Sequence, residues 1–362
     1  MNDETYIQLT LEIAKRGSGF VSPNPMVGCV ITKNNKIIGA GYHQKFGENH
    51  AEVNAINSAV ESLEGSTLYV NLEPCSHYGH TPPCVDKIIE SKIKRVVIGT
   101  LDVNPLVSGN GVKKLKRAGI EVKVGVLEKE CTELNKFFFK YITKKIPYVT
   151  LKIAQTLDGK IADQSNYSHW VTSADSRKMV HSFRAQYDSV LIGRRTAEID
   201  NPLLTVRLTE GRNPWRVVLD SGLKLNTELR LFNQNSDGKT ILVTSKESLT
   251  KKNKIEKLSE LGVRIIFVKQ NGNGKLNLKN VLKELAILEI TSVLVEGGAE
   301  VFSSFLRQNL FDDILLFISP KLLGSGISAF NSIKINDLKK AYKLKIKHSD
   351  TVGEDILLEL TK

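Results

Sequence analysis

The sequence lacks any uninterrupted apolar stretch close to the roughly 20 residues that a helix needs to cross a bilayer. It also lacks the basic start and apolar centre of a secretory signal, because its N-terminus, MNDETYIQLTLEIAKRG, begins acidic and polar and fits an amphipathic helix. Four cysteines in 362 residues argue against a disulfide framework. These absences disfavour membrane-spanning and disulfide-stapled secreted proteins, and we expect a cytoplasmic protein without a membrane partner.

The length and the pattern of apolar residues predict two α/β domains. A chain of 362 residues is long for a single core, and its hydrophobic content of 41% is ordinary for a globular protein. Strand patterns at 27–32, 36–41, 67–72, 95–100 and 121–126 alternate with helix patterns at 1–17, 50–63, 85–91, 112–118 and 128–141. Further strands are expected at 148–154, 189–192, 216–219, 240–243, 264–268 and 292–295, with helices between them. We place the domains at 1–145 and 146–362, joined through residues 144–147.

The net charge of +12 has two interpretations. One is a groove for nucleic acid, and the other is a lysine-rich surface with pockets for phosphorylated ligands. The lysines are scattered or lie on helix faces, with little aromatic interleaving. This arrangement favours a phosphorylated small molecule over nucleic acid as the partner.

The most informative pattern comprises His50, Glu52, Cys75 and Cys84. One imidazole and two thiolates form the ligand set of a catalytic zinc whose fourth position stays open to water. Glu52, two residues after His50, is the natural proton carrier for that water. The pattern H-x-E followed by P-C-x-x-C is typical of zinc nucleobase deaminases, although here eight residues separate the cysteines.

A closed structural zinc site is the alternative interpretation of the same residues. It would need a fourth ligand, for which His77 and His80 are near enough in sequence. An acid such as Glu52 has no use in a structural site. The other two cysteines, Cys29 and Cys131, have no partner at ligand spacing and are expected to be inert thiols.

The long loop between the cysteines, ending Gly-x-Thr-Pro-Pro-Cys, resembles the bifunctional riboflavin-biosynthesis deaminase/reductase family. Further motifs follow in the same order over nearly the whole chain: Pro23-Asn24-Pro25-Met26-Val27-Gly28, Asn104-Pro105-Leu106-Val107, Lys152-Ile153-Ala154, Leu157-Asp158-Gly159, Asp200-Asn201-Pro202, Glu296-Gly297-Gly298 and Pro320-Lys321-Leu322-Leu323-Gly324. The resemblance implies a cytidine-deaminase-like three-layer domain followed by a dihydrofolate-reductase-like α/β domain. In the first domain it implies that Asn24, His43 and His77, with Glu48 as a further candidate, contact the pyrimidine or its ribose. Position 80 is commonly Lys or Arg in this family, so His80 is a departure.

The second half lacks the G-x-G-x-x-G fingerprint of the usual dinucleotide-binding fold. Residues 293–302 instead read strand, paired glycines and helix, a pattern that lets backbone N–H groups approach a phosphate. The resemblance makes this the NADPH pyrophosphate loop. The NADPH site it implies consists of Ala154, Trp170, Thr196, Asp200, Ser221, Gly298, Ala299, Glu300, Val301, Phe302, Ser303 and Ser304. The sugar phosphate would meet Ser168, Arg184, Leu204, Arg207 and Glu296.

Two residues of this half leave questions open. Asn201 stands where family members often carry Asp. Lys152 and Glu296 are both candidates to assist proton transfer, and the sequence does not choose between them.

The resemblance implies a homo-oligomeric, Zn²⁺- and NADPH-dependent enzyme of riboflavin synthesis. The expected substrate is 2,5-diamino-6-ribosylamino-4(3H)-pyrimidinone 5′-phosphate, which is deaminated and then reduced to the ribitylamino compound. Two other classes remain. One is a nucleic-acid base deaminase with an accessory binding domain, and the other is a scaffold with a structural zinc. The motifs of the second half disfavour both.

Overall fold

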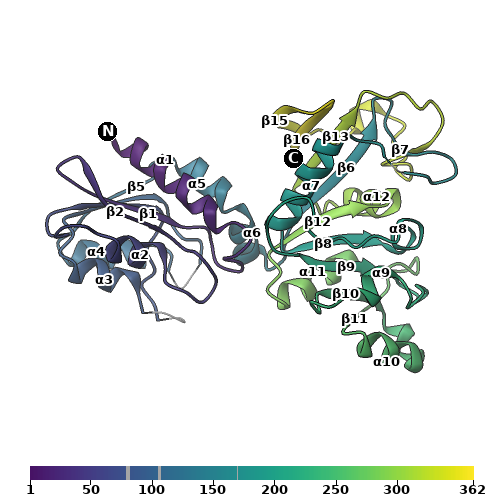
Figure 1. The fold of residues 1–362 in the computed structure, drawn as a ribbon, viewed down its shortest axis with the longest axis horizontal. Coiled ribbons are helices and arrows are strands. Elements are labelled where there is room, and N and C mark those ends of the chain that lie inside the picture. Colours follow the sequence, from purple (N-terminus) through teal and green to yellow (C-terminus); the bar gives the residue numbers. More distant parts are fainter. Residues whose placement is uncertain (79–81, 105–106, 169) are drawn as a thin grey trace. The chain divides into compact units, whose positions relative to one another are not determined.

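The computed structural model describes residues 1–78, 82–104, 107–168 and 170–362. The chain divides into two compact units, Met1–Ile146 and Pro147–Lys362 (Figure 1). The boundary expected from sequence, after residue 145, lies one residue from this division.

A five-stranded sheet forms the centre of the first unit, in the order β2-β1-β3-β4-β5. Its strands are β1 (Gly28–Lys33), β2 (Lys36–Tyr42), β3 (Thr67–Leu72), β4 (Arg95–Thr100) and β5 (Glu121–Val124). Strand β1 pairs antiparallel with β2 and β3, and β3, β4 and β5 are parallel. The β1–β2 turn uses Asn34 and Asn35, both with positive φ (49° and 61°), as a two-residue hairpin with the native twist requires.

Helices cover both faces of this sheet (Figure 1). One face packs against α1 (Asp3–Ala14) and α5 (Glu128–Leu134), around a cluster that includes Tyr6, Ile7 and Cys131. The other face packs against α2 (Ala51–Asn57), α3 (Cys84–Glu90) and α4 (Asn110–Arg117), around a second cluster that includes Ala55, Ile88 and Leu115. The unit is therefore a three-layer α/β/α structure.

Two helix predictions for the first unit are wrong in their bounds. The helix expected over 50–63 ends at Asn57, and Val60 is 85% exposed, so the apolar spacing beyond residue 57 does not mark a buried face. The helix expected over 128–141 is two helices, α5 and α6 (Lys136–Lys144), separated at Asn135. At this break, the side chain of Asn135 forms two hydrogen bonds to the backbone of Met26.

A nine-stranded sheet forms the second unit, in the order β11-β10-β9-β8-β12-β6-β13-β16-β15. Its strands are β6 (Tyr148–Thr156), β8 (Ser189–Gly193), β9 (Trp215–Leu219), β10 (Thr240–Ser245), β11 (Arg264–Val268), β12 (Ser292–Gly297), β13 (Asp313–Ser319), β15 (Lys345–Val352) and β16 (Asp355–Thr361). The pairings from β11 to β13 are parallel, and β16 and β15 join antiparallel. A small separate sheet pairs β7 (Lys160–Ala162) with β14 (Ile327–Ser328).

The helices of the second unit connect the parallel strands. They are α7 (Ala174–Gln186), α8 (Arg194–Asp200), α9 (Arg230–Asn233), α10 (Lys252–Glu260), α11 (Leu278–Ile287) and α12 (Ala299–Arg307). Short 3₁₀ turns occur at Lys246–Thr250 and Leu338–Lys340 in this unit and at Lys15–Gly17 in the first. Across the described ranges, no helix has the length and apolar character to cross a membrane.

Candidate functional site

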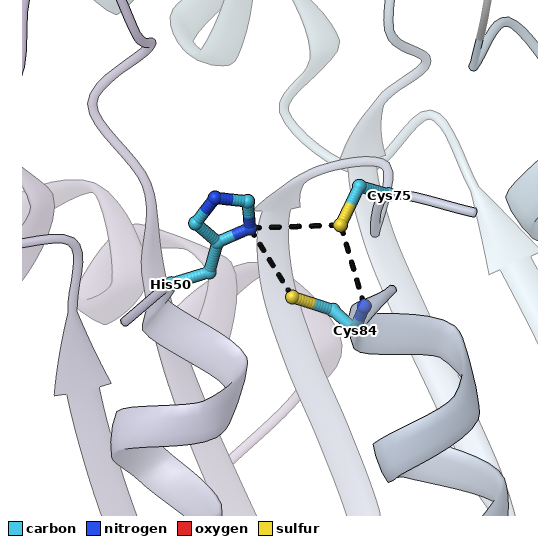
Figure 2. A group of neighbouring side chains, drawn as sticks. All are labelled: His50, Cys75 and Cys84. Atoms are coloured by element: carbon cyan, nitrogen blue, oxygen red, sulfur yellow. Dashed lines mark hydrogen bonds between the residues drawn. The ribbon is translucent and has the colours of Figure 1, made fainter. Parts of the chain in front are cut away.

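Three potential metal ligands converge in the first unit (Figure 2). His50 immediately precedes α2 with an extended backbone, Cys75 follows the end of β3, and Cys84 begins α3. His50 Nδ1 lies 3.5 Å from Cys75 Sγ and 3.3 Å from Cys84 Sγ. All three ligand atoms lie within 4.8 Å of one another.

These distances fit a tetrahedral zinc ion. Zn–N and Zn–S bonds at tetrahedral angles separate nitrogen from sulfur by about 3.6 Å. The Cys84 thiol and backbone N–H both donate to Cys75 Sγ, which lowers the pKa of the Cys75 thiol and favours its thiolate. Within the described part of the chain, no fourth His, Cys, Asp or Glu joins this group, and His80 lies outside it.

Glu52 occupies the first turn of α2, directly after the His50 position. Its side chain is buried, and burial raises the pKa of its carboxyl to about 7, with the negative charge of Cys75 as the next cause. Glycines in β2 let α2 lie close to the strand: a Cβ at Gly41 would stand 2.4 Å from the backbone nitrogen of Ala55. His50 and Glu52 therefore enter the site from one rigid helix start.

A cavity of about 220 Å³ opens beside the three ligands. Asn24, His43 and His77, the residues expected to bind substrate, all line it together with Glu48, His50, Glu52 and Cys75. The Nδ1 atom of His77 is buried and has no hydrogen-bond partner among the described residues.

His43 is engaged within the protein at both ring nitrogens. Nδ1 lies 3.0 Å from the carbonyl oxygen of Asn49, to which it can only donate, so Nε2 accepts from Asn24 Nδ2 at 3.2 Å. Burial lowers the pKa of His43, which keeps the ring neutral. The ring therefore fixes the orientation of the Asn24 amide group at the wall of the cavity.

The same cavity has lining residues to which the sequence analysis assigned no role, among them Glu73, Asp102, Asn104, Val107 and Phe138. Asn104 and Val107 belong to a motif quoted above, whose Pro105 and Leu106 lie outside the described residues. Burial raises the pKa of Asp102 to about 6. Phe138 comes from α6, far along the chain, and no local pattern indicates it.

Buried polar side chains hold the loops of this cavity in place. The Glu73 carboxylate accepts backbone N–H groups from Asp102, Gly109 and Val112 at 3.3, 2.9 and 3.1 Å. Asn135 accepts from the N–H of Met26 at 2.7 Å and donates to its carbonyl at 2.9 Å. The cysteine loop, the loop after β4 and the loop before β1 are thereby held around one space.

A much larger cavity, of about 1590 Å³, opens in the second unit. Among its lining residues are nearly all those predicted for NADPH and the sugar phosphate: Ala154, Ser168, Trp170, Arg184, Thr196, Asp200, Leu204, Arg207, Ser221, Glu296, Gly298, Ala299, Glu300, Val301, Phe302 and Ser304. Ser303 is the exception, because its side chain is fully buried and is not part of the cavity lining.

The glycine loop between β12 and α12 is tightly constrained. Gly298 has a φ of 81°, and a Cβ there would lie 3.0 Å from Thr196 Oγ1. A Cβ at Gly297 would lie 2.9 Å from Thr196 Cγ2. Only glycine suits this junction, which brings the start of α12 to the edge of the cavity.

Glu296, Arg184 and Lys152 form a buried charge cluster in the wall of this cavity. Arg184 donates to both oxygens of Glu296, at 2.6 and 2.7 Å, and Lys152 Nζ lies 3.9 Å from the same carboxylate. Burial alone would raise the pKa of Glu296, but Arg184 and then Lys152 lower it to about 2. Burial lowers the pKa of Lys152. Arg184 and Glu296, expected as separate contacts of a phosphate, are thus paired with each other.

Asn201 ends α8 with a φ of 37° and accepts the backbone N–H of Arg230 through Oδ1 at 2.8 Å. An aspartate at this position could accept the same bond. Its neighbour Asp200 accepts a hydrogen bond from Ser168 at 3.3 Å and faces the cavity.

The geometry defines a class: a zinc-binding deaminase unit joined to an α/β reductase unit. Residues 1–100 match the family "Cytidine and deoxycytidylate deaminase zinc-binding region", and residues 147–358 match the family "RibD C-terminal domain". The chain belongs to the RibD family, whose members are bifunctional deaminase/reductases of riboflavin biosynthesis.

Relatives cover the whole chain. The riboflavin biosynthesis protein RibD of Aquifex aeolicus is 47% identical, over 98% of this chain and 97% of its own. The RibD of Escherichia coli is 37% identical, over 99% of both chains. A Thermotoga maritima crystal structure, of a diaminohydroxyphosphoribosylaminopyrimidine deaminase/5-amino-6-(5-phosphoribosylamino)uracil reductase, has a TM-score of 0.88 and 43% identity over 99% of this chain and 98% of its own. An Acinetobacter baumannii RibD structure has a TM-score of 0.90 and 35% identity over the same shares of the two chains.

The family and the topology confirm the predicted fold classes, a cytidine-deaminase-like unit followed by a dihydrofolate-reductase-like unit. They also confirm a zinc-binding deaminase and an NADPH-using reductase that act in riboflavin biosynthesis. The nucleic-acid deaminase and the scaffold considered from the sequence are thereby set aside.

Proposed function

We propose that the first unit deaminates 2,5-diamino-6-ribosylamino-4(3H)-pyrimidinone 5′-phosphate and that the second unit reduces the product to 5-amino-6-ribitylaminouracil 5′-phosphate. The observation that carries this proposal is the cluster of His50, Cys75 and Cys84 beside a small cavity that Glu52 also lines, in a chain with a second cavity large enough for a dinucleotide.

In the deaminase unit, His50, Cys75 and Cys84 would hold Zn²⁺. When bound, the ion lowers the pKa of a water molecule and so supplies a nucleophile at neutral pH. The Glu52 carboxylate accepts a proton from this water and delivers it to the amino group that leaves as ammonia. Asn24, oriented by His43, presents its amide to the pyrimidine edge, and His77 lines the same cavity as a further contact.

In the reductase unit, the cavity would hold NADPH along the glycine loop and α12. When bound, NADPH would supply a hydride to C1′ of the ribosyl group, while the C1′–O4′ bond breaks and one proton goes to the freed ring oxygen. Glu296 carries no proton because its pKa is about 2, and Lys152 Nζ, the other candidate donor, lies 3.9 Å from its carboxylate. We therefore assign the proton to Lys152 Nζ rather than to Glu296.

Arg207 would bind the substrate 5′-phosphate, since a guanidinium donates paired hydrogen bonds to phosphate oxygens. Arg184 is committed to Glu296 through its Nε and Nη2 atoms. The cytoplasmic location and the homo-oligomeric state stay predictions.

Mass spectrometry of the products tests the whole proposal. Zinc-loaded protein, NADPH and the diaminopyrimidine phosphate should yield a product in which one amino group is replaced by oxygen and two hydrogens are gained. Without NADPH, the product should be deaminated only. Unchanged substrate under both conditions would contradict the proposal.

A further inference from the structure

The loop that carries Arg207 begins at Leu204, which is buried and has a positive φ of 55°. The Arg207 side chain is exposed, and its Nη1 donates to Thr205 Oγ1 at 2.7 Å. Because this guanidinium is bound to its own loop, its direction follows the backbone of residues 205–207. The residues that hold this backbone in place therefore also determine the direction of the Arg207 side chain towards the cavity.

Two side chains of α7 bind this backbone. His181 Nδ1 accepts the N–H of Arg207 at 2.9 Å, and Arg184 Nη1 donates to the carbonyl oxygen of Thr205 at 3.2 Å. His181 and Arg184 are three residues apart on one helix and so lie on the same face. The helix thus binds the loop through one backbone donor and one backbone acceptor.

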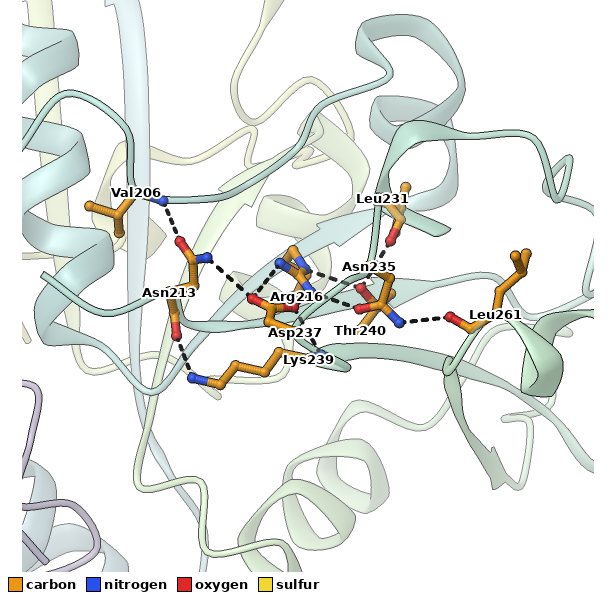
Figure 3. A network of polar contacts seen from close by, with 9 residues as sticks. All are labelled: Val206, Asn213, Arg216, Leu231, Asn235, Asp237, Lys239, Thr240 and Leu261. Carbon is orange, nitrogen blue, oxygen red and sulfur yellow. Dashed lines mark hydrogen bonds and ion pairs between the residues drawn. The ribbon is translucent and has the colours of Figure 1, made fainter. Parts of the chain in front are cut away.

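A second anchor reaches the loop through a polar network around the buried Arg216 (Figure 3). The N–H of Val206 donates to Asn213 Oδ1 at 2.9 Å, and Asn213 Nδ2 donates to Asp237 at 3.2 Å. Asp237 is paired with Arg216, whose side chain is 1% exposed. Arg216 also donates to Asn235 and Thr240, so the network joins the loop to β9 and β10.

The protonation of His181 suits its role as an acceptor. A backbone N–H only donates, so Nδ1 must be unprotonated and the proton must lie on Nε2. Burial, followed by the positive charges of Arg184 and Arg207, lowers the pKa of His181 to about 4. The imidazole is therefore neutral at neutral pH and its Nδ1 lone pair is always available.

We infer that His181 is a positioning residue of the reductase. It fixes the backbone of Arg207, while Asn213 fixes the adjacent Val206, so that the Arg207 guanidinium is held where the substrate phosphate binds. His181 acts through Arg207, and the inference rests on the proposed phosphate-binding role of that arginine.

Two nearly isosteric substitutions isolate the hydrogen bond. In His181→Asn the amide oxygen takes the place of Nδ1 and still accepts the N–H of Arg207, whereas His181→Leu has the same size and no acceptor. We expect His181→Leu to raise the reductase KM for the phosphorylated substrate about tenfold, the loss of one hydrogen bond of roughly 1.4 kcal/mol, with a smaller change in kcat. His181→Asn should stay within about twofold of the parent, and KM for NADPH should not change in either variant.

A double-mutant cycle with Arg207→Met separates positioning from a general packing role. If His181 acts through Arg207, His181→Leu should have no further effect in the Arg207→Met background. It should also have no effect on a substrate that lacks the 5′-phosphate. Additive effects of the two substitutions, or an equal KM increase with the unphosphorylated substrate, would overturn the inference.

Two further outcomes keep the test decisive. If Arg207→Met weakens phosphorylated and unphosphorylated substrates equally, the proposed phosphate role of Arg207 fails, and the inference fails with it. If His181→Leu loses NADPH binding, the cycle is repeated with Asn213→Ala in its place. This substitution releases the N–H of Val206 on the other side of the loop. Asn213→Ala should show the same dependence on Arg207, and additivity there would also overturn the inference.

Discussion

The cavity of the first unit has a volume of about 220 Å³, against about 1590 Å³ for that of the second. The smaller one takes its three metal ligands and its acid from residues 50–84, whereas the lining of the larger extends from Lys152 to Ser332. The first site depends on a few side-chain atoms that must surround one metal ion. The second depends on backbone segments and ion pairs from many helices and strands.

The difference reflects the chemistry that each site performs. Zinc accepts few atom types at nearly fixed distances, so its ligands are recognisable in the sequence. Hydride transfer needs mainly the positioning of a cofactor against its acceptor, and many combinations of loops and charges can provide that. Removing one atom should therefore abolish the first activity, while the second should respond mostly to changes in packing and charge.

The largest effect should follow from Cys84→Ala, which removes one metal ligand. We expect zinc content to fall and ammonia release to decrease by about three orders of magnitude or more, because the water loses the ion that lowers its pKa. Reduction of the deaminated substrate should be unchanged. Metal analysis, ammonia release and NADPH oxidation measure the three quantities. Cys131→Ala, a buried thiol outside the site, is the control. If Cys84→Ala lowered the rate of reduction as much as that of deamination, the two sites would not be independent.

Next comes Glu52→Gln, which keeps the shape of the side chain and removes the proton carrier. Ammonia release should fall about 10²- to 10⁴-fold, the usual contribution of general acid–base catalysis. Bound zinc should remain stoichiometric, unlike in Cys84→Ala. Glu61→Gln on the exposed surface provides the matched control. Deamination at the parental rate would remove Glu52 from the mechanism.

The second unit should respond to Glu296→Gln through its stability as well as its activity. Arg184 and Lys152 would be left without a buried counter-charge, which costs about 3–5 kcal/mol of the free energy of unfolding. Denaturant titration should show a weakened transition of the second unit and an unchanged one of the first. Glu228→Gln, whose partner Lys257 is also exposed, should leave the transition of the second unit almost unchanged, because water screens this ion pair. Equal losses in both variants would contradict the role of the buried cluster.

The same cluster predicts how stability of the second unit depends on pH. The folded pKa of Glu296 is about 2 against a reference of 4.5, so folding favours the ionised carboxylate. Its contribution is fully present above pH 4.5 and is lost as the pH falls towards 2. Glu296→Gln should remove this part of the acid dependence. An identical acid profile in parent and variant would show that other groups dominate it.

Much of the fold and the metal site could be predicted from the sequence, because both depend on short patterns. The hairpin at Asn34-Asn35 and the strands β4 and β11 lie where local periodicity and turn residues place them. The zinc ligands are recognisable because the ion accepts few residue types, which stand here in two short motifs.

Other features depend on distant partners. The strands expected from sequence end at residue 295, whereas β13, β15 and β16 complete the sheet. Most of β15 is exposed and has no apolar alternation, and the continuous apolar run of β13 does not by itself distinguish a strand from a buried helix. Phe138 and Ser303 show the same limit within the sites, since only the packing of α6 and α12 decides which side chains face a cavity.

The smallest expected effect tests whether the deaminase site is as local as its motif suggests. Asn135, in the break between α5 and α6, makes two hydrogen bonds to Met26, close to the loop residue Asn24. In Asn135→Ala the N–H of Met26 loses its acceptor, while its carbonyl still accepts from Asn71 at 3.0 Å. We expect a loss of about 1–2 kcal/mol of stability in the first unit.

The same substitution should raise the deaminase KM several-fold and leave zinc content unchanged, because the ligands are held by other elements. Asn57→Ala, at the exposed end of α2, should change neither quantity. A KM increase in Asn135→Ala would mean that substrate binding in the deaminase, like the Arg207 loop of the reductase, depends on a buried anchor far away in sequence. In that case only the metal site of the deaminase would depend on local sequence alone. A parental KM would instead mean that substrate binding in the deaminase is local too, since the zinc motif and its neighbouring loops would suffice to shape the cavity.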